Sequence, residues 1–179
     1  MASTPPDVIE RVTGYIRHNA TKEPQTIREL VQKGHDQLAG LLEGMSEEQA
    51  AFKPGPDDWS VLELMAHVVT AKRGVARICA RLARGEQVTN FGGEGEEQDG
   101  VTRGAFASLA EARSAMDAAH RELLDFIDGP LAQADLETRF RHFIFGELSC
   151  REWAAFQRVH DGDHAGQIGQ ITSAPGYPA

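Results

Sequence analysis

The sequence predicts an all-α protein, an antiparallel four-helix bundle with one long crossover connection. Three observations support this fold class: a repeated helix-start motif, apolar residues spaced three and four positions apart, and almost no alternating pattern of the kind that strands show. The length of 179 residues suits one domain. We therefore expect a single domain over residues 1–179.

Three helix starts carry the same motif, in which a serine side chain bonds the backbone N–H three residues on and a glutamate there returns a bond. The motif begins at Ser60, Ser108 and Ser149, each time before an apolar periodic run. The helices expected from it span residues 60–84, 107–128 and 149–171.

Two further helices are expected nearer the amino terminus. Pro24 suits the first position of a helix over 24–43, where apolar residues recur at helical spacing, and a shorter helix fits 6–17. The connector 45–58 contains two prolines and a glycine in close succession, which predicts irregular structure. Segment 85–103, rich in Gly and Glu, is the expected crossover; it serves as a lid or contact surface, or is simply a solvated loop.

Composition and charge exclude several classes of function. Lys plus Arg number 18 against 27 Asp plus Glu, a net charge of −9, and no stretch gathers five basic residues. This argues against binding to nucleic acid or to an anionic membrane surface. The longest mostly apolar run, 61–69, is too short to span a bilayer. With no secretory signal and no paired cysteine motif, we expect a cytoplasmic protein.

Three histidines fall on apolar helix faces. His67 lies on the apolar face of the helix over 60–84, and His160 and His164 replace apolar residues one turn apart in the last helix. Residues at i and i+4 lie about 40° apart around a helix, so both imidazoles can face one ion. An unpaired buried ring nitrogen costs roughly 1–3 kcal/mol, and one divalent ion would satisfy all three lone pairs. The pattern favours a metal site; the alternative is three satisfied core histidines.

Several other side chains are weaker candidates. His35 and His120 lie at the edges of their apolar faces as candidate pocket residues. Asp161 and Asp163 flank the His160/His164 pair, where a solvated position is the simpler interpretation of each. The candidates for the pocket, or for hydrogen bonds around the metal ligands, are His35, His120, Asp163 and Gln167. Cys150, in the first turn of the last helix, is a candidate nucleophile, although packing is the simpler role.

Two stretches resemble the DinB-like (DinB/YfiT) superfamily. Trp59-Ser-Val-Leu-Glu-Leu-Met-Ala-His67 resembles the start of its second helix, and His160-Asp-Gly-Asp-His164-Ala-Gly-Gln167 resembles its last helix; the likeness extends over about 24–171. The resemblance implies a four-helix bundle, often a homodimer, that holds nickel, zinc or iron on three histidines. At the matching positions those histidines are His67, His160 and His164. Some relatives are thiol-dependent transferases or isomerases that use bacillithiol, mycothiol or glutathione, and others are described as metal-dependent hydrolases.

These observations lead to alternative functions. We expect a metal-dependent enzyme, thiol S-transferase-like or hydrolase-like, with a three-histidine site that leaves a coordination position open. It would act on a small-molecule substrate, with a low-molecular-weight thiol as a candidate cosubstrate. One alternative is a non-catalytic stress-response or ligand-binding module, whose metal would have a closed coordination sphere with a fourth ligand such as His35 or His120. The other is a structural bundle without metal.

Overall fold

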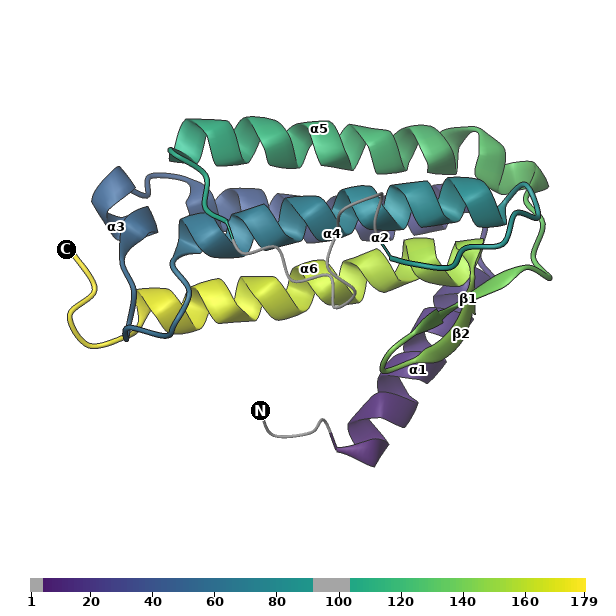
Figure 1. Ribbon diagram of the computed structural model, residues 1–179, viewed down its shortest axis with the longest axis horizontal. Helices are drawn as coiled ribbons and strands as arrows, with labels where there is room; N and C mark the ends of the chain where they lie inside the picture. Colours follow the sequence, from purple (N-terminus) through teal and green to yellow (C-terminus); the bar gives the residue numbers. More distant parts are fainter. Residues whose placement is uncertain (1–4, 92–103) are drawn as a thin grey trace.

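The computed structural model describes residues 5–91 and 104–179. Four long helices lie side by side in a bundle (Figure 1): α2 (Pro24–Leu42), α4 (Val61–Leu82), α5 (Leu109–Asp128) and α6 (Cys150–Thr172). α2 and α4 each pack against both α5 and α6, so the four helices surround a common interior. The predicted four-helix bundle is confirmed.

The crossover determines the direction of the helices. The chain leaves α4 at one end of the bundle and enters α5 at the other, so these neighbours run parallel (Figure 1). An ion pair between Arg73 and Glu122, about halfway along each helix, agrees with that register. α2 runs antiparallel to α5, because Arg28 near the start of α2 bonds Asp128 at the end of α5. Most of the crossover, 92–103, lies outside the described residues, and with it the predicted lid or contact surface.

The three predicted serine caps are formed, and the full two-bond motif is present at two of them; at Ser108, Glu111 bonds the backbone N–H of Ala107 instead of that of the serine. Ser60, Ser108 and Ser149 each accept a hydrogen bond from the backbone N–H three residues on. Glu63 and Glu152 return the bond and complete the motif at α4 and α6. Because the serine is the capping residue, each helix proper starts one residue after it.

Four features differ from the prediction. The connector 45–58 contains a short helix, α3 (Glu47–Ala51), which starts with the same motif at Ser46. Residues between α5 and α6 form a 3-10 turn, η1 (Pro130–Gln133), and an antiparallel hairpin of β1 (Arg139–His142) and β2 (Gly146–Ser149). Four-residue strands are too short to show an alternating pattern. The first helix, α1 (Pro6–Ala20), continues one turn beyond its predicted end at 17.

The core consists of two apolar clusters. One includes Ile27, Ile78 and Trp153, and the other includes Leu64 and Ile168. Between them lies a set of buried polar side chains to which all four long helices contribute, hereafter the polar layer: His35, Lys72, His120, Gln157 and Asp161. Groups of this kind are costly to bury unless they bond one another, so the layer fixes how the helices face each other.

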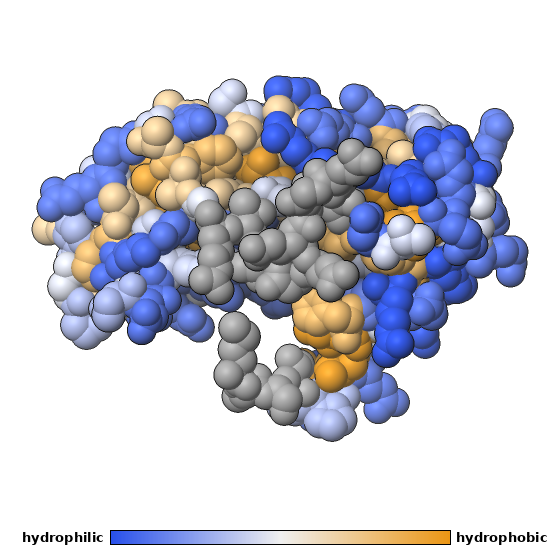
Figure 2. All heavy atoms as spheres, in the orientation of Figure 1, coloured by the Kyte–Doolittle hydropathy of each residue, from blue (hydrophilic) through white to orange (hydrophobic). Residues whose placement is uncertain are grey.

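The face of the molecule shown in Figure 2 has many polar residues and several local apolar areas. One such area lies at the lower edge of the view, where Figure 1 places the turn of the hairpin; Phe143, in that turn, is 83% exposed. Among the described residues, none of the helices is both long enough and apolar enough to cross a bilayer.

Candidate metal centre

The fold brings His67, His160 and His164 together. α4 provides His67, and α6 provides the other two, one helical turn apart. One ring nitrogen from each histidine lies within 4.8 Å of the other two. The Nε2 atoms of His160 and His164 are 3.1 Å apart, and the ring of His67 is 4.8 Å from that of His164. These three side chains, the histidine cluster, therefore share one small space between α4 and α6.

The surroundings favour the neutral form of two of the cluster histidines, His160 and His164. Burial lowers the pKa of His160 well below its usual value, and the neighbouring His164, His67 and Lys72 lower it further. Burial also lowers the pKa of His164. A neutral imidazole has a lone pair on one ring nitrogen, which is the form that binds metals.

Gln167 fixes the orientation of one ring. Its Oε1 lies 2.8 Å from Nδ1 of His164. Because an amide oxygen only accepts, Nδ1 is the donor and the lone pair of the neutral ring is on Nε2, the atom that faces His160. Gln167 was a candidate for a hydrogen bond to one of the metal ligands, and its contact with His164 is a bond of that kind.

Aromatic side chains border the cluster. The ring of Trp59 lies 5.4 Å from that of His67, and Phe156 lies 5.7 Å from His160. His142, at the end of β1, is buried and contacts Phe156 edge-on, with the ring centres 4.6 Å apart. Its Nδ1 accepts from the backbone N–H groups of Ile144 and Phe145, and burial lowers its pKa to about 4. His142 was not singled out from the sequence, although the aromatic-rich run 140–145 was an available signal.

A buried ion pair joins the two helices that carry the cluster. Nζ of Lys72 lies 2.9 Å from Oδ2 of Asp161, and both side chains have no exposed surface. Asp161 Oδ1 also accepts from Nε2 of Gln157 at 2.7 Å. The solvated position expected for Asp161 was wrong. α2 covers it at Gly34, where an added Cβ would lie only 2.9 Å from Oδ2 of Asp161.

His35 and His120 lie outside the cluster. Their rings stack in parallel, 3.9 Å apart, between α2 and α5. Nε2 of His35 lies 3.3 Å from Asp117, and Nε2 of His120 lies 3.0 Å from Oε1 of Gln32. Neither histidine adds a ligand to the group of three.

Asp163 is exposed and, within the described part of the chain, makes no hydrogen bond to the cluster.

The cysteines are buried. Burial raises the pKa of Cys150 to about 11 and raises that of Cys79 well above its usual value. Sγ of Cys79 donates to the carbonyl of Cys150. Such thiols are poor nucleophiles near neutral pH, so the structure supports a packing role for Cys150 instead of a catalytic one.

The comparison with protein families decides the classification. The family model described as the DinB superfamily matches residues 12–168. The chain belongs to the DinB superfamily. Among curated proteins it is similar to the uncharacterized protein YuaE of Bacillus subtilis, with 23% identity over 73% of this chain and 87% of YuaE. Among solved structures it resembles TT2238, a four-helix bundle protein, at a TM-score of 0.59 with 20% identity, covering 82% of this chain and 98% of that one. At that identity, the likeness concerns the fold alone.

Proposed function

We propose that this DinB-superfamily protein is a metal-dependent enzyme that activates a thiol or water for attack on a small electrophilic substrate. The reaction would be S-transferase-like or hydrolase-like. The single observation that carries the proposal is the convergence of three histidine nitrogens within 4.8 Å of one another. Family membership supports the same chemistry.

The residues present fit a divalent ion. Three imidazole nitrogens suit nickel, zinc or iron, and the lowered pKa values of His160 and His164 keep their lone pairs available. Nε2 of His164 is the ligand atom that its bond to Gln167 selects. When bound, the ion would act as a Lewis acid that lowers the pKa of a thiol or water and polarises the substrate.

The chain itself positions and shields this chemistry. The hydrogen bond from His164 to Gln167 holds one ligand ring. The Lys72–Asp161 pair fixes α4 against α6 less than two turns from His67. Trp59 and Phe156 provide apolar neighbours beside His67 and His160. His142 accepts backbone bonds at Nδ1, so its ring proton is on Nε2 and it is a neutral hydrogen-bond donor beside the cluster.

The enzyme proposal is favoured over a binding module by the number of ligands. A non-catalytic site would close its coordination sphere with a fourth protein ligand. The two histidines that could have provided one, His35 and His120, instead bond Asp117 and Gln32. Among the described residues, the group suited to a metal has three members, which leaves room for a substrate or cosubstrate.

Two further parts of the proposal rest on the family alone: a low-molecular-weight thiol is the proposed cosubstrate, and the proposed assembly is a homodimer. The proposed location is the cytoplasm, where the two free cysteines would stay reduced. The charge of −9 gives no support for a nucleic-acid partner.

The test is elemental analysis of protein purified without a nickel column, followed by assays with thiol and electrophile pairs and with ester substrates. Wild type and His18→Ala, a change at an exposed histidine on α1, should each retain about one equivalent of metal. His160→Ala should lose both metal and activity. Metal-free wild type would contradict the proposal, and loss of metal without any change in activity would leave only the binding module.

A further inference from the structure

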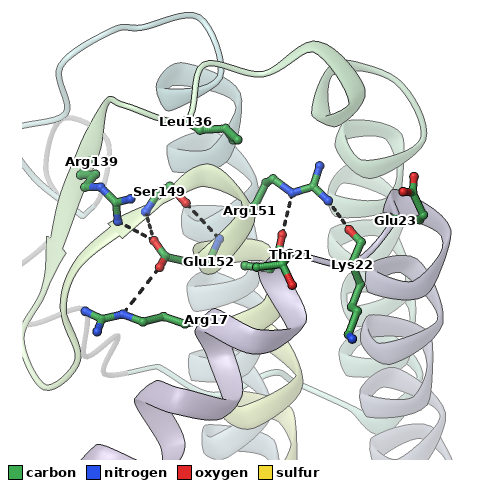
Figure 3. A pocket seen from close by; sticks show the side chains of 10 residues that line it. Arg17, Thr21, Lys22, Glu23, Leu136, Arg139, Ser149, Arg151 and Glu152 are labelled. Atoms are coloured by element: carbon green, nitrogen blue, oxygen red, sulfur yellow. Dashed lines mark hydrogen bonds and ion pairs between the residues drawn. The ribbon is translucent and has the colours of Figure 1, made fainter.

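A second candidate site lies at the start of α6, whereas the histidine cluster lies near the middle of that helix. A cavity of about 420 Å³ opens where the end of α1, the start of α2, the hairpin and the first turn of α6 meet (Figure 3). Glu152 in its wall precedes His160 by eight residues, about 12 Å along the helix axis. The cavity is therefore separate from the proposed metal site, and its volume is within the range of sites for small molecules.

The wall of this cavity is positively charged. Its basic residues are Arg17, Lys22, Arg139 and Arg151, and its acidic residues are Glu23 and Glu152. The cavity thus has an excess of two positive charges in a chain whose net charge is −9. Cationic side chains gathered in one concave place on an acidic protein concentrate the field that attracts an anion.

The buried acid in the wall is already paired. Glu152 accepts from Nη1 of Arg139 at 2.7 Å and from the backbone N–H of Ser149 at 2.8 Å, and Nε of Arg17 lies 3.7 Å away. Figure 3 shows these contacts on one side of the cavity. The carboxylate is neutralised where it lies, and it holds the guanidinium of Arg139 in place.

Arg151 is held in place on the opposite side. Its Nε donates to the carbonyl of Ala20 at 2.7 Å, and its Nη2 donates to the carbonyl of Lys22. In Figure 3 the third nitrogen of this guanidinium points away from both carbonyls, so its N–H groups are not used by these bonds. A guanidinium fixed in this way loses little side-chain entropy when it binds an anion.

The start of α2 adds to the positive field. Its first residue, Pro24, has no N–H group, and the N–H groups of Thr26 and Ile27 donate to the carbonyl of Glu23, so the contribution of this helix start comes from the helix dipole. The positive end of that dipole favours a negative charge nearby.

We propose that this cavity binds a small oxyanion, the phosphate or paired carboxylates of a metabolite-sized molecule. Arg139 and Arg151 are the planar donors, and Lys22 adds a point charge at the rim. The site is too small and too isolated for an extended polyanion, because the rest of the chain is acidic. It is independent of the metal and of the proposed reaction.

The probes are inorganic phosphate and citrate, titrated into the full chain at constant ionic strength and followed by isothermal calorimetry and by amide chemical shifts. Both measurements use metal-free protein, so they test anion binding even if the protein proves to have no metal-dependent activity. Saturable binding of phosphate indicates a phosphate-bearing ligand, and preference for citrate indicates a carboxylate. Either result supports the site.

Arg139→Gln and Lys22→Gln should each weaken the binding of the better probe, by roughly tenfold for the arginine, because each removes a charge-assisted hydrogen bond. Arg121→Gln, an equal change of charge at an exposed position on α5, is the matched control and should bind as wild type does. The proposal is overturned if neither anion binds saturably, if both cavity variants bind like wild type, or if the control weakens binding as much as they do.

Discussion

The molecule buries histidines in two places, and the places differ in how the rings face each other. In the histidine cluster the nitrogens of His67, His160 and His164 point toward one another. In the polar layer the rings of His35 and His120 lie parallel, and each Nε2 already has a protein partner. Parallel rings direct their lone pairs side by side, whereas a metal needs lone pairs that converge. Convergence, and not burial alone, distinguishes a candidate ligand set from structural histidines.

The largest expected effect is the loss of metal from the cluster. His164→Ala should abolish the retention of metal, because two nitrogens are a poor site for a divalent ion. His120→Ala should leave the metal content unchanged, since its partners are Gln32 and the ring of His35. Elemental analysis of both variants checks this contrast. Equal loss of metal from both would mean that the two places act as one site.

The second prediction concerns protein stability, and it involves the ion pair of the polar layer that lies beside the histidine cluster. Lys72→Met leaves Asp161 buried without its cation, which should lower the free energy of unfolding by roughly 3–5 kcal/mol. The double variant Lys72→Met/Asp161→Leu removes both charges and should recover much of that loss. Urea unfolding of the metal-free protein measures both. A single variant as stable as wild type would show that the pair is not needed for folding.

A third prediction concerns the bond that orients His164. Gln167→Ala removes the acceptor at Nδ1 and should weaken metal binding by roughly 10–100-fold. Gln170→Ala, an exposed position one turn from Gln167, is the control and should bind metal as wild type does. Competition with a chelator gives both affinities. Unchanged affinity in Gln167→Ala would assign the ring orientation to packing alone.

The smallest expected effect is a change in how the free energy of unfolding depends on pH, through His120 in the polar layer. Burial lowers the pKa of folded His120 to about 3, so below its ordinary value near 6.5 the unfolded chain binds more protons than the folded one. Stability should therefore fall as the pH drops from 6.5 toward 3. This histidine contributes at most about 1.4 kcal/mol per pH unit.

The comparison uses His120→Gln in metal-free protein. Its unfolding free energy should decrease less than that of wild type between pH 6 and pH 5. His18→Gln, at an exposed histidine, should retain the wild-type slope. Identical slopes in wild type and His120→Gln would show that His120 is protonated in the folded state.

The helices and the cluster could be predicted because both depend on local periodicity. Helix starts follow from Ser–Glu pairs three residues apart, and the face shared by His160 and His164 follows from their spacing. Lys72 and Asp161 could not be found in this way. Their burial depends on the approach of α2 at Gly34, a contact between segments more than 100 residues apart.

The hairpin and His142 were missed for a related reason. Strands of four residues have too little alternation to be recognised. The turn between them, 143–145, leads into Gly146, the first residue of β2, whose φ of +75° favours glycine. The position of His142 near the cluster then depends on how the hairpin folds onto Phe156. Sequence periodicity predicts neither the pairing of the two strands nor the packing of the hairpin against Phe156.

The polar layer also separates the two apolar clusters along the bundle. We therefore expect that each end of the bundle can open locally without exposing the apolar cluster of the other end. Amide hydrogen exchange should then show two protection levels along α6, one on each side of Asp161. A metal on His67 and His164 would slow exchange mainly in the half that contains Leu64 and Ile168.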